Sequence, residues 1–101
     1  MQDYNILIEF DGVQHFQISG KYTPDFNALN KIQKYDIEKT LFCIENDIKL
    51  LRICFKNIKE IYYYINLSLT CKEKLIFSDW KSYDFIIENI GNITFLTGVG
   101  E

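Results

Sequence analysis

The sequence predicts an α/β domain in which short apolar strands alternate with amphipathic helices. Residues 6–11 and 48–55 are apolar segments rich in β-branched side chains, and the segment between them has the three- and four-residue periodicity of a helix. The chain has 101 residues, of which 48% are hydrophobic and 25% charged, as expected of one folded domain rather than two or a disordered chain. We expect a β-α-β-α unit followed by a C-terminal β/α extension.

Residues 6–11 are predicted to form the first strand. Apolar side chains stand on both faces of the segment, which is typical of a strand covered on both faces. Because side chains alternate along a strand, Ile8 and Phe10 share one face, and Glu9 and Asp11 share the other. Two carboxylates therefore point the same way where the strand ends.

Polar side chains follow this strand directly. Gly12 permits a sharp turn, which would bring Gln14 and His15 back toward the carboxylates. Carboxylate and carbonyl oxygens at such a place suit Mg²⁺ or Mn²⁺ better than zinc. The alternative is an ordinary turn, in which Asp11 accepts local backbone hydrogen bonds and His15 packs beside Phe16.

A long helix is predicted over residues 23–46. Thr23 is expected to be its N-cap, and Pro24 to occupy its first turn. The polar positions Gln33, Asp36 and Lys39 are spaced three apart, so they either form a solvated face or look toward the end of the first strand. The predicted core-facing positions are Phe26, Leu29, Ile37, Leu41 and Ile44.

The second strand, residues 48–55, is apolar except at Lys49 and Arg52. A strand, a helix and a strand in this order predict parallel pairing of the two strands. Arg52 interrupts a segment that should be buried, so it needs a partner. We expect that partner to be a carboxylate at the end of the first strand, with a substrate phosphate as the alternative.

The rest of the chain predicts two more helices and two more strands. Asn57 is expected to cap a helix over residues 57–69, where three consecutive tyrosines either divide between core and rim or form an interface. A strand at 75–77 is followed by Ser78 as the cap of a helix that buries Trp80. The last two elements are a helix over 79–90, ended by Gly91, and a strand over 92–97.

Charge and cysteine content limit the functional classes. The net charge is −3 and the 11 Lys and Arg residues are scattered, which argues against a large basic face for nucleic acid. No apolar run reaches the roughly 20 residues that span a membrane, and the start shows no signal-peptide pattern. Three cysteines without a C-x-x-C pair predict reduced thiols. We expect a soluble, intracellular protein.

Two blocks of the sequence resemble a known family. Residues 8–16 read IEFDGVQHF, and residues 33–53 carry a Q-K-x-D-x-x-K-x-x-x-C-x-x-N-x-IKLLRI pattern. Both are similar to segments of small nucleases related to the very-short-patch repair and homing endonucleases, within the PD-(D/E)XK superfamily. The resemblance covers residues 4–66, about two thirds of the chain. It implies a minimal restriction-endonuclease-like core. Residues 71–101 lie outside the resemblance, and we expect them to extend the same fold, so that residues 1–101 form a single domain.

The resemblance also implies a function, which is hydrolysis of nucleic-acid phosphodiesters by an endonuclease that uses Mg²⁺ or Mn²⁺. Glu9, Asp11 and the Phe10 carbonyl would hold the metal ion, while Gln14 and His15 would position water or transfer a proton. Glu9 and Asp11 thus join Gln14 and His15 in the candidate catalytic set. Further binding residues would be Gln33, Asp36, Lys39 and Arg52.

The family places another metal-binding Asp on a strand upstream of residues 6–11, and no residue of this sequence is assigned that role. The alternative function is therefore a catalytically impaired relative that binds protein or nucleic acid, or inhibits another protein. The edge of the first strand suggests a homodimer as one assembly, because an unpaired strand edge can pair with a second copy.

Overall fold

A parallel sheet of four strands forms the centre of the computed structural model, which describes residues 5–21 and 23–98. A lead-in is expected over residues 1–5 and a Gly-containing tail after residue 97; residues 1–4 and 99–101 of these segments lie outside the described part of the chain. The strands follow the order of the sequence across the sheet, and each neighbouring pair is parallel, as predicted for the first two. They are β1 (Ile6–Asp11), β2 (Lys49–Cys54), β3 (Leu75–Phe77) and β4 (Leu96–Thr97).

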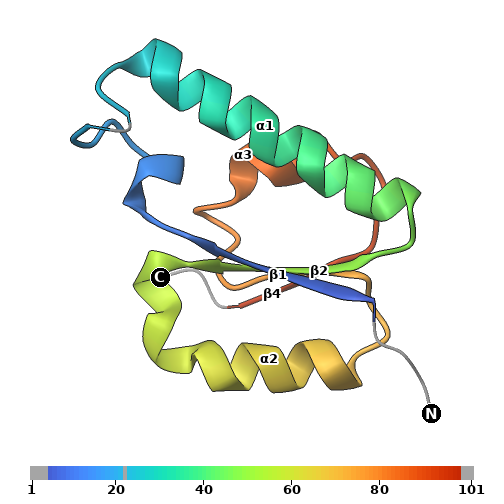
Figure 1. Cartoon of the computed structure of the whole chain (residues 1–101). Helices are drawn as coiled ribbons and strands as arrows, with labels where there is room; N and C mark the ends of the chain where they lie inside the picture. The colour runs from blue at the N-terminus through green and yellow to red at the C-terminus, as the bar shows by residue number, and fades with distance from the viewer. Residues whose placement is uncertain (1–4, 22, 99–101) are drawn as a thin grey trace.

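Helices cover both faces of the sheet. Figure 1 shows α1 (Phe26–Glu45) and α3 (Asp84–Ile87) on one face and α2 (Ile61–Thr70) on the other. Two short 3₁₀ helices follow β1 and β2: η1 (Val13–His15) begins after Gly12, and η2 (Phe55–Glu60) begins directly at the end of β2. The α/β class and the strand-helix-strand order are thus confirmed. None of the helices in the described ranges is long and apolar enough to cross a membrane.

Strand β2 separates two apolar cores. Leu50 and Cys54 lie in the core shared with α1 and α3, whereas Leu51 and Ile53 lie in the core shared with α2. This alternation follows the pleat of a strand that is buried on both faces. Arg52 is the one charged residue among the buried positions of β2, and its side chain lies on the face of the sheet that α1 covers.

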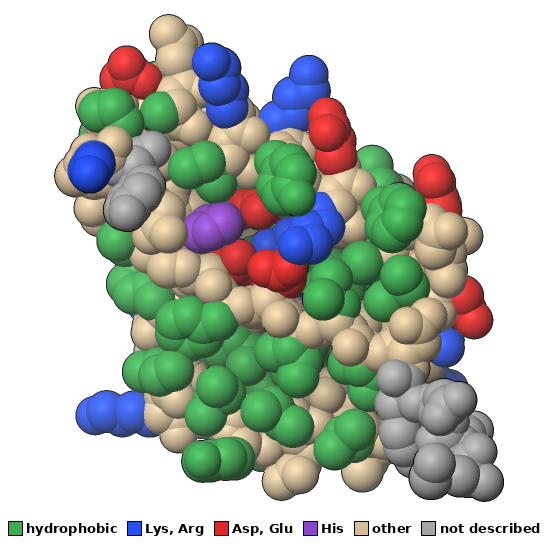
Figure 2. Space-filling model, in the orientation of Figure 1, with side chains coloured by type: hydrophobic (Ala, Val, Ile, Leu, Met, Phe, Trp, Pro, Cys, Tyr) green, Lys and Arg blue, Asp and Glu red, His purple; other side chains and the backbone are tan. Residues whose placement is uncertain are grey.

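The prediction that β1 is buried on both faces is wrong. Ile8 and Phe10 are 45% and 47% exposed, because β1 is an edge strand and α2 packs against β2. The opposite face of β1, with Glu9 and Asp11, lies beneath α1. Figure 2 shows hydrophobic side chains exposed over β1 and α2, below the level of α1.

The start of α1 also differs from the prediction. Asp25 is its N-cap, and the Asp25 carboxylate accepts a hydrogen bond from the Ala28 backbone N–H at 2.9 Å. Thr23 is buried in the preceding loop instead, where its hydroxyl lies 3.0 Å from the Ser19 carbonyl oxygen. As a result Phe26, which was expected in the core, is 71% exposed at the first helical position.

The two other predicted helix caps bind each other. The Ser78 hydroxyl donates to Asn57 Oδ1 at 2.8 Å, and Asn57 has non-helical backbone angles within η2. The α-helix that Asn57 was expected to cap therefore begins only at Ile61. Ser78 instead fixes the end of β3 against η2, so it caps no helix.

The C-terminal extension belongs to the same sheet, but its last helix and last strand are shorter than predicted. Strand β3 has the predicted bounds, whereas β4 covers only Leu96–Thr97. Helix α3 is one turn long because the Asp79 carboxylate accepts hydrogen bonds from the Lys81 backbone N–H and the Ser82 hydroxyl, which form a turn. Trp80 lies on this turn and is 47% exposed rather than buried.

Candidate functional site

Three predicted site residues meet where β1 ends beneath α1. Asp11 is the last residue of β1, and the single turn of η1 returns His15 toward it, so that His15 Nδ1 lies 3.6 Å from Asp11 Oδ1. Asp36 comes from α1, and its Oδ2 lies 2.7 Å from His15 Nδ1. The second sequence block thus supplies a carboxylate that orients the histidine of the first.

A buried arginine, Arg52, bridges the carboxylates of Asp11 and Asp36. Arg52 Nη1 donates to both oxygens of Asp11, at 3.0 and 2.9 Å, and lies 3.5 Å from Asp36 Oδ1. Arg52 also donates to the Thr40 hydroxyl oxygen at 3.2 Å. The expected carboxylate partner of Arg52 is therefore Asp11, and a guanidinium with several hydrogen-bond partners can stay charged inside the protein.

The hydroxyl of Tyr83 completes this network. It donates to Asp11 Oδ2 at 2.8 Å, from a position 72 residues further along the chain. Burial, the negative charge of Asp11 and the hydrogen bond to it raise the pKa of Tyr83 far above its usual value of about 10. Tyr83 is therefore protonated near neutral pH, where its hydroxyl donates to Asp11.

Asp36 sets the ionisation of His15. The hydrogen bond to Asp36 raises the pKa of His15 above 6.5; burial opposes this effect, and the charges of Asp36 and Asp11 reinforce it. Gln33 adds a positional restraint, because its Nε2 donates to the His15 carbonyl oxygen at 3.0 Å. Through Gln33 and Asp36, α1 thus holds both the backbone and the ring of His15.

The histidine borders an open pocket of about 390 Å³. Glu9 and Lys39 form an ion pair on its wall. In Figure 2 the histidine lies among acidic and basic side chains near the middle of the face shown. The residues that line the pocket are Glu9, Gln14, His15, Lys31, Ile32, Tyr35, Asp36 and Lys39.

Most of the predicted site residues converge, but in two layers. The pocket wall holds the residues predicted at the strand end and on the helix, namely Glu9, Gln14, His15, Asp36 and Lys39. Asp11 and Arg52 lie buried behind them, each 1% exposed or less. The side chain of Phe10 lies on the opposite face of β1, and the role of its backbone carbonyl as a metal ligand stays a prediction.

Four residues of this region were not singled out as site residues. Lys31 and Tyr35 precede Lys39 by eight and four positions, so helical spacing was a usable signal for both. Thr40 had the same signal, because it follows Asp36 by four positions on the same helix. Tyr83 had no such signal, because nothing in the local sequence indicates that a tyrosine binds a residue 72 positions away.

One group of side chains here could offer ligand atoms to a metal ion. One ligand atom each from Asp11, His15 and Asp36 can be chosen so that all lie within 4.8 Å of one another. Carboxylate oxygens suit Mg²⁺ and Mn²⁺, and the imidazole nitrogen extends the set toward softer metals. The resemblance implied that Glu9 and Asp11 together bind the metal ion. In the structure each of these carboxylates has another partner: Glu9 pairs with Lys39, and Asp11 binds Arg52.

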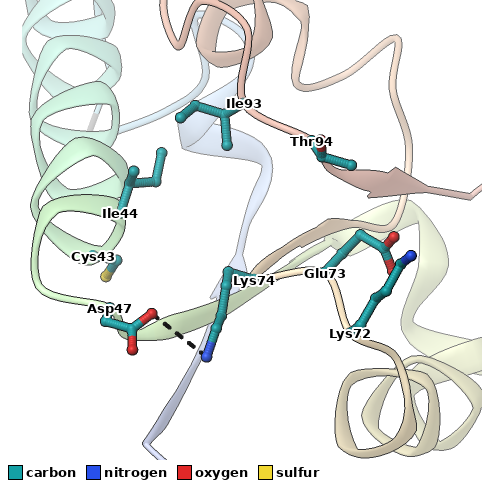
Figure 3. Close-up of a pocket in the computed structure, with 8 residues that line it drawn as sticks. All are labelled: Cys43, Ile44, Asp47, Lys72, Glu73, Lys74, Ile93 and Thr94. Carbon is teal, nitrogen blue, oxygen red and sulfur yellow. Dashed lines mark ion pairs between the residues drawn. The ribbon is translucent and has the colours of Figure 1, made fainter.

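A second pocket, of about 470 Å³, lies at the other end of the sheet. Figure 3 shows its walls, which come from the end of α1 and from the segments that lead into β3 and β4. Ligand sites of parallel sheets lie at the carboxyl ends of the strands, and this pocket is at their amino ends. Burial raises the pKa of the Cys43 thiol, which disfavours the nucleophilic thiolate. The pocket beside His15 is therefore the better candidate site.

Comparison of the sequence with models of protein families found no match. Searches of curated proteins and of solved structures found no match either. The function is therefore proposed from the geometry of the site together with the resemblance of the two sequence blocks.

Proposed function

We propose that this domain is an endonuclease, which hydrolyses phosphodiester bonds of nucleic acid in the pocket beside His15. One observation carries the proposal: the two sequence blocks that resemble small PD-(D/E)XK nucleases meet at this pocket, where Asp36 binds His15 at 2.7 Å. A histidine that is oriented by a carboxylate at the edge of an open pocket is a recurrent acid–base arrangement.

His15 is the acid–base group of this proposal. Asp36 occupies Nδ1, so the other ring nitrogen, Nε2, exchanges protons with water or substrate. In its neutral form Nε2 accepts a proton from the attacking water, and Asp36 stabilises the imidazolium that results. Lys31 and Lys39 line the same pocket and supply positive charge for the phosphate.

The proposal includes a divalent cation, Mg²⁺ or Mn²⁺. The carboxylates of Asp11 and Asp36 would hold it, next to His15. A cation in such a place polarises a phosphoryl oxygen and lowers the pKa of a bound water. Arg52 already contributes a positive charge to both carboxylates, so we expect weaker cation binding than at two free carboxylates.

A second candidate function is binding of nucleic acid or protein without cleavage. Its support is the internal pairing of the acidic groups: Glu9 with Lys39, Asp11 with Arg52, and Asp36 with His15. Carboxylates that are neutralised within the chain need no metal ion for their stability. The same pocket would then bind phosphates through its lysines and lack hydrolytic activity.

Cleavage assays separate the two candidates. Supercoiled plasmid and labelled single-stranded DNA and RNA would each be incubated with the protein in Mg²⁺, in Mn²⁺ and in EDTA. We expect cation-dependent cutting that His15→Gln slows by about 10² to 10⁴-fold, the usual contribution of an acid–base group. Asp47→Asn is the matched control, because Asp47 is an exposed acidic residue at the other pocket.

Two further variants locate the cleavage site on the first strand. Glu9→Gln and Asp11→Asn each remove one carboxylate while keeping the size of the side chain. We expect both to reduce cutting, with circular dichroism confirming that they fold. If no substrate is cut under any condition while nucleic acid is still bound, the endonuclease proposal is wrong and the binding function replaces it.

A further inference from the structure

Three residues of α1 form a stripe along the pocket beside His15. Lys31, Tyr35 and Lys39 are spaced four residues apart, so they lie on one side of the helix with a rise of about 6 Å per step. All three line the pocket. The pocket is therefore bordered by a cation, an aromatic ring and a second cation in a row, which we call the Lys-Tyr-Lys stripe.

The tyrosine of this stripe is available to a ligand. Tyr35 is 62% exposed, although its side chain is large and mostly apolar. Lys39 Nζ lies 6.0 Å from the centre of the Tyr35 ring, so the ring and the charge are close enough to act on the same ligand. An exposed ring beside a cation is the combination with which proteins stack a nucleobase and hold its phosphate.

The charges of the stripe are only partly neutralised. Lys39 pairs with Glu9, but within residues 5–21 and 23–98 no acidic side chain lies at ion-pair distance from Lys31. The chain as a whole carries a net charge of −3. Local positive charge on an acidic domain suits a few phosphates of one strand better than the many phosphates of a duplex face.

We propose that the Lys-Tyr-Lys stripe binds single-stranded nucleic acid, with an unpaired base stacked on Tyr35 and flanking phosphates at Lys31 and Lys39. This inference rests on the endonuclease function proposed above and specifies its substrate class. A base exposes its full ring face for stacking on a side chain only when it is unpaired, so Tyr35 selects single strands over duplexes. His15, on the wall of the same pocket, then lies beside the bound backbone.

Binding measurements on an inactive protein test this inference. In the His15→Gln background, fluorescence anisotropy would compare a 20-nucleotide DNA, the RNA of the same sequence and the corresponding DNA duplex at one salt concentration. We expect tighter binding of the single strands than of the duplex. Tyr35→Ala should weaken single-strand binding by about 5- to 150-fold, the range for one stacked base, whereas Tyr35→Phe should preserve it.

Tyr62→Ala is the matched control, because Tyr62 is a 79% exposed tyrosine on α2, and we expect it to leave binding unchanged. Duplex binding as tight as single-strand binding, no binding of any of the three nucleic acids, or equal affinity of Tyr35→Ala and its parent would overturn the inference. If the active protein cuts duplex DNA and Tyr35→Ala cuts it equally well, the stripe inference fails while the endonuclease proposal stands. If single strands bind through Tyr35 but the active protein never cuts them, the proposed catalysis fails instead.

Discussion

Asp11 is the residue on which the buried network depends. Its two oxygens accept hydrogen bonds from Arg52 and Tyr83, and its exposed fraction is only 1%. A carboxylate buried to this extent is tolerated only while its charge is balanced and its lone pairs are occupied. Each partner of Asp11 is therefore expected to matter for stability, apart from any role in catalysis.

Replacing Arg52 by methionine should destabilise the fold strongly. The substitution keeps an apolar stem of similar length but leaves Asp11 buried without its cation, which typically costs about 3 to 5 kcal/mol. Urea unfolding measures this change in free energy. Lys39→Met is the control, since the Lys39–Glu9 pair is partly exposed and should contribute no more than about 1 kcal/mol. Equal losses in both variants would contradict the network.

Tyr83→Phe removes a single hydroxyl and its hydrogen bond to Asp11. Because the acceptor is a buried carboxylate, we expect a loss of about 1 to 3 kcal/mol in the free energy of unfolding. Tyr62→Phe, on the exposed side of α2, should leave that free energy nearly unchanged. A Tyr83→Phe variant as stable as the wild type would mean that the hydroxyl has no net stabilising role.

The raised pKa of His15 predicts a pH dependence of stability. The pKa of His15 in the folded protein lies above the unfolded value of about 6.5. The His15–Asp36 interaction therefore stabilises the folded state fully below a pH of about 6.5, and this stabilisation is lost as the pH rises through the folded pKa. His15→Gln should therefore destabilise more at a pH of about 5.5 than at about 9. NMR titration of His15 in EDTA measures the pKa directly, and Asp36→Asn should lower it. An unchanged pKa in Asp36→Asn would exclude this origin of the shift.

At the scale of elements, the N-terminal cap of α1 is a local feature with a measurable effect. Asp25→Ala removes the side-chain acceptor for the Ala28 N–H and should reduce the free energy of unfolding by about 0.5 to 2 kcal/mol. Asp25→Asn keeps an acceptor and should lose much less. If Thr23→Ala proved the only costly change in this loop, Asp25 would not be the cap that stabilises α1.

The elements that were predicted well are those determined by local pattern. The bounds of β1 and β3 follow from apolar, β-branched runs between polar residues, and parallel pairing follows from the intervening helices. The prediction failed at polar residues that could either cap a helix or bind a distant side chain. Asn57 and Ser78 are both good helix caps by type, but they bind each other across 21 residues. Such a choice depends on tertiary structure and cannot be predicted from local sequence.

At the scale of the whole molecule, the same distinction applies to the site. The grouping of Asp11 and His15 was predictable, because a strand end and a turn bring them together within five residues. Asp36 was predicted as a site residue from its helical spacing together with the resemblance to nucleases. The contribution of Tyr83 depends on how the C-terminal extension folds back over the sheet, which no local pattern records.

The exposed edge and face of β1 also follow from the arrangement of the whole sheet. β1 pairs only with β2 among the strands of the described ranges, so its other edge offers unpaired backbone groups. Homodimer formation through this edge remains a prediction. Light scattering at several protein concentrations would detect it as a doubling of the mass of 12.0 kDa.

The most direct test of the proposed hydrolytic site is the rate constant for cleavage of a single-stranded oligonucleotide as a function of pH. With His15 as the base, the rate should rise with pH through an inflection at the pKa of His15 in the cation-bound protein, because only the neutral imidazole accepts a proton. Asp36→Asn should move that inflection to lower pH, and His15→Gln should abolish it along with most of the rate. Cleavage that persists at the wild-type rate in His15→Gln would contradict a hydrolytic site built on this histidine.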